Sequence, residues 1–201
     1  MAQSYWGILI SSAIGALIGS ALTLIATLIS HRLQRSTQKE KDADQLRGLL
    51  QAIHDEIEAL WEIYLSTAGT QIEALPDGHP LLIYWTVTQD YFTIYNTNAF
   101  FIGRIQDHDL RKAVVVAYAR ARAVIDGFRM NNELVHEYEY ALSLFQETQN
   151  PVHQTRANAY LQRLARYAAR LKRQHSELSE AVSEVLRRLR KEGVLAPKDE
   201  P

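Results

Sequence analysis

The first thirty residues of the chain contain no charged side chain, and within them residues 6–29 read WGILISSAIGALIGSALTLIATLI. As an α-helix this run extends over ~36 Å, which is enough to cross the ~30 Å hydrocarbon core of a bilayer with some tilt. No basic residue precedes the run, and it is longer than the apolar stretch of a secretory signal peptide. We therefore expect residues 1–31 to form a transmembrane anchor that is not cleaved.

Basic residues follow this run directly, with His31 first and then Arg32, Arg35, Lys39 and Lys41. The N-terminal side of the run offers only the α-amino group. By the positive-inside rule, we expect the part after the run to lie in the cytoplasm and the short N-terminus to lie outside. Arg32, Arg35, Lys39 and Lys41 are also suited to binding the anionic lipid headgroups of the inner leaflet.

Small residues recur at every fourth position along the predicted membrane helix, at Gly7, Ser11, Gly15, Gly19, Thr23 and Thr27. Such a column allows two helices to approach closely, and Gly15 with Gly19 forms a GxxxG pair at its centre. A single membrane helix has to find its partner in another molecule, so the column predicts a homo-oligomer. The alternative is that Gly, Ser and Thr are ordinary constituents of membrane helices.

The sequence after the anchor has helical periodicity and predicts an all-α fold. Apolar residues at steps of three and four indicate a long helix over residues 46–75, which can continue directly from the membrane segment. The stretch 76–80 (PDGHP) interrupts it. Residues 81–87 (LLIYWTV) are aromatic and β-branched, but no partner strand is evident. The sequence does not decide whether residues 81–87 are extended or helical.

Two further helices are expected in residues 32–150, which we interpret as a cytosolic helical domain. Thr88 is a suitable N-cap for a helix that reaches Ile102, with Gly103 ending it. Asp107 is a suitable N-cap for a second helix that ends at the Asn150-Pro151 pair. The amides of Asn96, Asn98, Asn131 and Asn132 are expected at helix ends or in buried hydrogen bonds.

The most regular pattern lies in residues 151–193, where one apolar seam alternates steps of three and four: Ala157, Leu161, Leu164, Ala168, Leu171, His175, Leu178, Val182, Val185 and Leu189. The seam predicts a heptad helix that ends near Gly193, followed by a tail over residues 194–201. A coiled coil between chains and an antiparallel bundle within one chain both produce such a seam. His175 interrupts it, and we expect a hydrogen-bonded structural histidine there rather than a pH sensor.

Charge is segregated between the domains, although the formal net charge is only −1. Residues 42–147 are acidic, whereas the last helix is basic and presents an arginine stripe opposite its seam, at Arg156, Arg163, Arg166, Arg170 and Arg173. One interpretation is charge compensation within the chain. The other is a site for an anion such as a nucleic acid, a nucleotide or a phosphorylated partner protein, because guanidinium forks match phosphate oxygens. Tyr160 and Tyr167 are the aromatic residues near the stripe that can stack on a base.

The residues do not predict an enzyme. The chain contains no cysteine, which excludes a thiolate nucleophile, a Cys-ligated zinc and an iron–sulfur cluster. It also lacks the glycine-rich, HExxH and GxSxG motifs of common catalytic sites. One ExxH, formed by Glu133 and His136, falls short of the two that a di-iron bundle needs. We therefore assign no catalytic residue, no metal ligand and no cofactor.

Residues 90–134 contain the pieces YFTIYNTNA, IGRI before an acidic turn, and FRMNNEL. This stretch resembles a helical segment of small bacterial membrane-anchored proteins of uncharacterised function. Proteins of that kind include antiphage-defence effectors that permeabilise the inner membrane. The resemblance implies a single-pass protein of the bacterial inner membrane that acts as a gated, channel-like or membrane-disrupting effector, controlled by its cytosolic helices. The alternative is a membrane-tethered scaffold that conducts nothing and recruits a protein or a nucleic acid.

Overall fold

The structure is a computed structural model that describes the backbone of residues 2–86 and 91–191, and the side chains of residues 27, 29–86 and 91–190. All regular secondary structure in these residues is helical, and they contain no strand. The predicted all-α fold is therefore confirmed. The chain divides into two compact units, Met1–Arg47 and Gly48–Pro201, and each is considered by itself.

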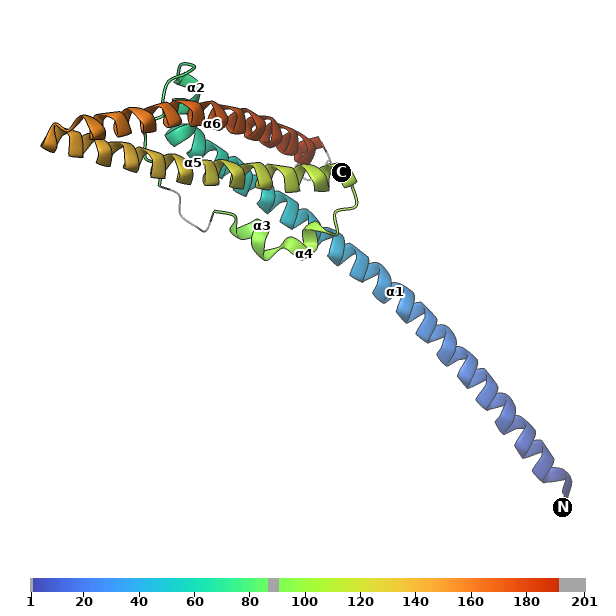
Figure 1. Ribbon diagram of the computed structural model, residues 1–201. Helices are drawn as coiled ribbons and strands as arrows, with labels where there is room; N and C mark the ends of the chain where they lie inside the picture. The colour runs from blue at the N-terminus through green and yellow to red at the C-terminus, as the bar shows by residue number, and fades with distance from the viewer. Residues whose placement is uncertain (1, 87–90, 192–201) are drawn as a thin grey trace. The chain divides into compact units, whose positions relative to one another are not determined.

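Helix α1 comprises Ala2–Tyr64, so the backbone of the first unit and the start of the second belong to one helix (Figure 1). In the first unit the described side chains are mostly exposed, including Ile29 and Leu33. In the second unit the helix turns an apolar face inward, with Leu50, Ile53 and Ile57 buried. The change from an exposed to a buried face marks the beginning of the folded helical domain.

A π-helix, η1 (Leu65–Gly69), and the short helix α2 (Thr70–Ala74) follow α1 without a break. A Cβ on Gly69 would lie only 2.9 Å from Leu65 Cδ2, so the absence of a side chain permits the tight packing of η1. The helical run ends at Leu75, which is extended, just before Pro76. Gly78 adopts φ +77° in the turn that follows, a conformation that glycine tolerates best.

Residues 81–86 form neither helix nor strand, and their main chain is held by two asparagines of α5. Asn131 Nδ2 donates to the carbonyl oxygens of Leu81 (3.3 Å) and Ile83 (3.1 Å). Asn132 accepts from Trp85 N (3.2 Å) and donates to Trp85 O (2.9 Å). The two side chains thus satisfy backbone groups that a neighbouring strand satisfies in a sheet. Val87, the last residue of the segment considered above, lies outside the described residues.

The prediction of one continuous helix from Thr88 to Ile102 is wrong for residues 91–102, the part of this range that the structure describes. Two short helices occur instead, α3 (Thr93–Thr97) and α4 (Ala99–Ile102). The break falls at Asn98, whose backbone leaves the helical region at φ −113° and ψ 19° and whose Nδ2 bonds Ile94 O at 2.9 Å. Asparagine side chains compete in this way with the helical backbone. Thr88 lies outside the described residues.

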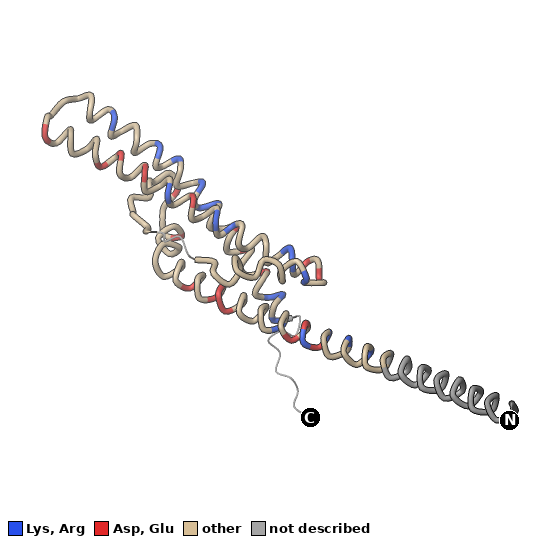
Figure 2. Tube along the Cα trace, turned by 90° about the horizontal axis from the view of Figure 1, so that it is seen from below, with Lys and Arg blue, Asp and Glu red and all other residues tan. Residues whose placement is uncertain are grey.

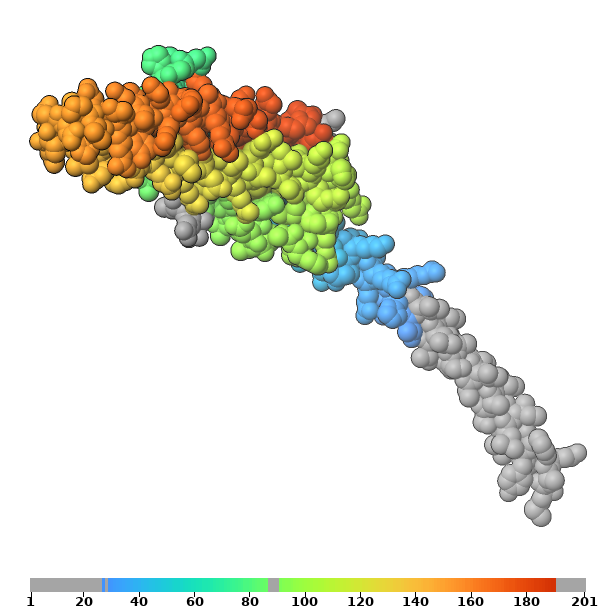
Figure 3. Space-filling view, viewed as in Figure 1, coloured from blue at the N-terminus to red at the C-terminus, as the bar shows by residue number. Residues whose placement is uncertain are grey.

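Helices α5 (His108–Thr148) and α6 (Pro151–Lys191) form an antiparallel hairpin and lie side by side along their length (Figures 1 and 3). The predicted cap at Asp107 is confirmed, because Asp107 Oδ1 accepts from Leu110 N at 2.7 Å. At the tip, Gln149 adopts φ 54°, and Asn150 Oδ1 accepts from Val152 N at 3.0 Å. Asn150 therefore caps α6, with Pro151 in the first helical position that suits proline.

The apolar seam of α6 is buried within the chain. All ten predicted positions are buried except Leu161, which is half-buried. Close packing against α5 shows that the seam serves a helical hairpin within one chain, the second of the two arrangements left open above. Gly193 and the tail over residues 194–201 lie outside the described residues.

Candidate functional site

The arginine stripe of α6 is exposed over its whole length. Among the described side chains, no carboxylate lies within ion-pairing distance of Arg163, Arg166, Arg170 or Arg173. We call these four residues the arginine ridge. Arg156 differs from them, because its Nη2 lies 3.7 Å from Glu137 Oε2. Four of the five predicted anion-binding residues are therefore free to meet an anion from outside.

Other basic residues of α6 have partners. Lys172 Nζ lies 2.6 Å from Asp77 Oδ1, and this hydrogen bond lowers the pKa of Asp77. Arg190 Nη2 lies 2.9 Å from Glu58 Oε1 of α1. Arg188 Nη1 lies 3.6 Å from Asp109 Oδ2 of α5. In Figure 2 the basic residues are distributed along α6, and the helices beside it carry most of the acidic residues. Charge compensation within the chain thus accounts for these residues and leaves the ridge uncompensated.

Glu184 is the carboxylate with the most basic contacts in this part of α6. Its oxygens accept from Arg187 Nε and Nη2, both at 2.8 Å, and from Arg188 Nε at 2.6 Å. The hydrogen bonds from Arg187, followed by those from Arg188, lower the pKa of Glu184 to about 2. Its negative charge is therefore held at the C-terminal end of α6 over the whole physiological pH range.

Three ridge residues, Arg163, Arg166 and Arg170, line an open groove between α6 and α5, and the sequence did not predict this groove. The lining on α6 also includes Tyr167 and Gln174, and α5 contributes Ala123, Asp126, Gly127, Met130 and Leu134. A second hollow lined by Arg170, Arg173 and Gln174 adjoins it. Among the described residues of α5 that line the groove, Asp126 is the one carboxylate and pairs with Arg129, while the others are small or apolar, so the ridge has no carboxylate partner there.

At the groove, α5 and α6 approach closely through a glycine. A Cβ on Gly127 would lie 2.6 Å from Gln174 Oε1 and 2.8 Å from Leu171 Cδ2. Gln174 Nε2 donates to the carbonyl oxygen of Ala123 at 3.2 Å, and its Oε1 is buried without a partner among the described residues. A glycine inside a regular amphipathic helix is the sequence signal that marks this contact.

Two half-buried tyrosines accompany the ridge, one heptad apart. The guanidinium of Arg163 lies 5.3 Å from the ring centroid of Tyr160, and that of Arg156 lies 5.8 Å from it. Arg170 lies 5.8 Å from the ring centroid of Tyr167. Both tyrosines are outside the buried seam and are partly exposed, and the arginines beside them lie over their rings.

His175 lies in the seam and joins three helices through hydrogen bonds. Its Nδ1 is 2.8 Å from Tyr64 Oη, and its Nε2 is 3.0 Å from Glu73 Oε1. The Trp61 ring stacks on the imidazole with centroids 6.0 Å apart. Burial, and secondarily the charge of Glu73, raises the pKa of Tyr64 and keeps its hydroxyl protonated. The predicted structural histidine is confirmed, with Glu73 as its acceptor and Tyr64 as its donor.

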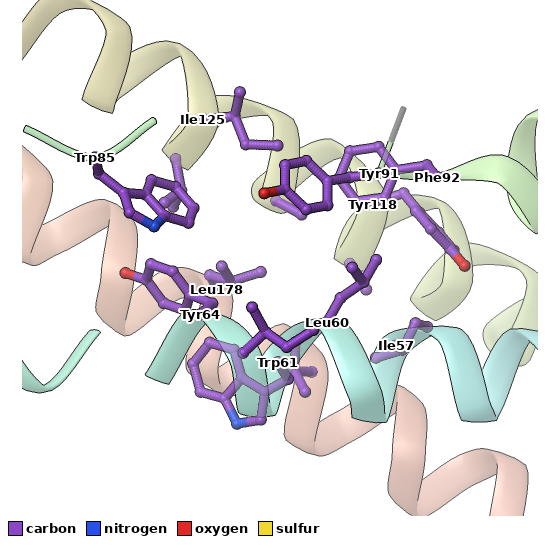
Figure 4. A pocket seen from close by; sticks show the side chains of 15 residues that line it. Ile57, Leu60, Trp61, Tyr64, Trp85, Tyr91, Phe92, Tyr118, Ile125 and Leu178 are labelled. Carbon is purple, nitrogen blue, oxygen red and sulfur yellow. The ribbon is translucent and has the colours of Figure 1, made fainter. Parts of the chain in front are cut away.

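An apolar cavity lies between α1, the residues Trp85, Tyr91 and Phe92, and the hairpin, where the rings of Trp61, Tyr64, Trp85 and Tyr91 surround it (Figure 4). Its volume is about 70 Å³, whereas an engineered apolar cavity that holds benzene has ~150 Å³. The cavity is therefore a packing gap, too small for a nucleotide. The open groove along the ridge is the better candidate for ligand binding.

The predicted membrane segment falls mainly outside the described side chains. Of its small-residue column, Gly7, Ser11, Gly15, Gly19 and Thr23 lie outside them, and Thr27 is exposed. Arg32, Arg35, Lys39 and Lys41 are exposed on α1. Among the described residues, no helix is both long and apolar enough to cross a membrane.

Glu133 and His136, the pair considered above for a metal, are exposed on α5. Nowhere in the described ranges do three His, Asp or Glu side chains gather closely enough to hold a metal ion. In comparisons with known proteins, no family model, no curated protein and no solved structure matches the chain.

Proposed function

We propose that this chain is a membrane-tethered adaptor whose helical domain binds a polyanionic partner along the arginine ridge. The observation that carries the proposal is the set of four exposed guanidiniums without a carboxylate partner among the described residues. Like charges three and four residues apart on a helix repel each other. A bound anion removes that repulsion and gains charge-assisted hydrogen bonds.

The tether is the uncharged segment over residues 6–29, whose length and flanking charges support a single membrane span. The basic residues from His31 to Lys41 support a cytoplasmic location for the helical domain. In a bacterium this places the protein in the inner membrane, with the N-terminus outside. Arg32, Arg35, Lys39 and Lys41 then lie near the anionic headgroups, whereas the ridge belongs to the folded domain and serves a different partner.

The proposal is tested by binding of fluorescently labelled inorganic polyphosphate to the full chain in phosphatidylcholine nanodiscs, which carry no net lipid charge. Arg166→Glu with Arg170→Glu should weaken binding by at least about tenfold at low salt. The matched control is Arg47→Glu with Lys112→Glu, which changes the net charge equally at two exposed positions that do not line the groove. Equal loss in both variants, or no binding by the unmodified chain, contradicts the proposal.

A second candidate function is a homo-oligomeric, channel-like effector, and the column of small residues from Gly7 to Thr27 favours it. In that case a ligand on the helical domain shifts the balance between closed and open assemblies, which requires different affinities for the two. Expression in bacteria should then depolarise the membrane. Replacing residues 1–30 with an unrelated anchor should abolish depolarisation, whereas an adaptor should tolerate the replacement.

A further inference from the structure

The ridge combines two kinds of group that single-stranded nucleic acids need. Guanidiniums lie at positions 163, 166, 170 and 173, and the rings of Tyr160 and Tyr167 lie beside them. Along the helix axis the ridge extends over ~15 Å and the two tyrosines are ~10.5 Å apart. Charged and aromatic groups therefore occur together along this part of α6, and Tyr167 with three of the arginines lines the groove.

The tyrosines can offer their faces to a ligand. Each ring is half-buried, so its position is fixed by the helix, and the guanidiniums above it are exposed. An exposed guanidinium is free to turn from a ring to a phosphate, since both interactions suit its planar fork. The ring face that it leaves is then open to a base.

The opposite wall of the groove suits bases better than phosphates. Met130 is 44% exposed, and it lines the groove together with Leu134 and Gly127. Asp126 also lines the groove, and its carboxylate lies 3.3 Å from Arg129 Nη1. An apolar wall with one carboxylate repels phosphates and leaves them on the arginine side, while bases gain apolar contact.

We propose that the arginine ridge and its groove bind single-stranded nucleic acid, with phosphates on the arginines, one base stacked on Tyr167 in the groove and another on Tyr160, one heptad before it on α6. This inference rests on the proposed function and names the class of polyanion. Stacking requires bases whose faces are exposed, and these occur in single strands, whereas a duplex hides them. Polyphosphate and phospholipid headgroups have no ring to stack, so they use the arginines alone.

The experiment uses the full chain in phosphatidylcholine nanodiscs and a fluorescein-labelled oligothymidylate strand of about 12 nucleotides, within the range of known single-strand sites. Tyr160→Leu with Tyr167→Leu keeps apolar bulk and removes both rings. Its matched controls are Tyr160→Phe with Tyr167→Phe, which keeps the rings, and Phe100→Leu, which removes an exposed ring on α4. Circular dichroism of each variant checks that the helices are intact.

We expect the leucine pair to weaken strand binding at least about fivefold for each base that stacks, with polyphosphate binding unchanged. The phenylalanine pair and Phe100→Leu should bind the strand like the unmodified chain. A duplex of the same length should bind more weakly than the strand. If polyphosphate binds but the leucine pair has no effect on the strand, or the duplex binds equally well, this inference is overturned and the proposed function stands. If polyphosphate and the strand both fail to bind, the proposed function is overturned as well.

Discussion

The middle and the C-terminal end of α6 are both rich in arginine, yet their arginines have different surroundings. Arg188 and Arg190 reach Asp109 of α5 and Glu58 of α1. Arg163, Arg166 and Arg170 face a groove wall made mainly of small and apolar residues of α5. Arg188 and Arg190 stand at other heptad positions than the ridge residues, so the difference comes both from the face of α6 that each arginine occupies and from the helix that lies next to that face. A basic helix is compensated where acidic helices reach it, and it is open to a ligand where they do not.

The largest loss of stability is expected from a substitution that pushes α5 and α6 apart at the groove. In Gly127→Val the new side chain meets Gln174 and Leu171, to which even a Cβ would lie 2.6 Å and 2.8 Å away. Overpacking of this kind should lower the free energy of unfolding by about 3 kcal/mol. Urea unfolding of the full chain in detergent micelles, followed by circular dichroism, measures the change.

The matched control for this prediction is Gly48→Val, because a Cβ at Gly48 meets nothing within 4 Å. That variant should leave the free energy of unfolding nearly unchanged, since valine is at least as favourable as glycine in a helix. The Arg188 and Arg190 ion pairs should persist in both proteins. Equal stability of the two variants would show that α5 and α6 do not need the close contact at Gly127.

His175 lies between the middle and the C-terminal end of α6, and its replacement should have the next largest effect on stability. His175→Leu removes the acceptor of the buried Tyr64 hydroxyl. Leaving that hydroxyl unsatisfied should lower the free energy of unfolding by about 2 kcal/mol. Adding Tyr64→Phe should recover part of the loss, because the unsatisfied group is then gone. Tryptophan fluorescence reports this region through Trp61, and additive effects of the two changes would contradict the coupling.

Much of the helical domain follows from local sequence signals. Asp107 was predicted as an N-cap from its position before a periodic run, and its side chain accepts the expected hydrogen bond from Leu110. The α6 seam was predicted from its heptad spacing and is buried almost throughout. Both features depend on residues close together in the chain. Local periodicity and capping chemistry were therefore sufficient to predict them.

Features that depend on distant residues were not predictable in the same way. The break between α3 and α4 is a local feature that was also missed: Asn98 Nδ2 bonds Ile94 O beside its own backbone N–H, and periodicity carries no signal for that side-chain bond. The 81–86 segment is held by Asn131 and Asn132, about 47 to 50 residues further along the chain. For the site, the sequence predicted the arginines but not the α5 wall with Gly127. The wall exists only because the hairpin brings α5 and α6 together.

Removing charge from each part of α6 should change stability in opposite directions. Arg188→Gln with Arg190→Gln breaks the contacts to Asp109 and Glu58 and should lower the free energy of unfolding by roughly 1 kcal/mol or less. Arg166→Gln with Arg173→Gln removes two ridge charges that have neither an ion pair nor a ring contact among the described side chains, and should raise it by a few tenths of a kcal/mol, an effect of about the size of like-charge helix pairs. Thermal melting at low salt measures both, and a loss of stability in the second variant would mean that the ridge has partners within the chain.

The smallest effect is a dependence on pH that belongs to the C-terminal end of α6. Hydrogen bonds from Arg187 and then Arg188 lower the pKa of Glu184 from 4.5 to about 2 in the folded chain. A lowered folded pKa stabilises the protein above the unfolded value, and this contribution is lost as the pH falls through the folded value. Glu184→Gln should therefore melt below the unmodified chain at pH 6, with the difference shrinking from pH 4.5 towards pH 2. Arg163→Gln, at a position with no carboxylate partner among the described residues, should show a melting difference that hardly changes over this range. A difference that shrinks equally in both variants would assign the pH dependence to net charge instead of to Glu184.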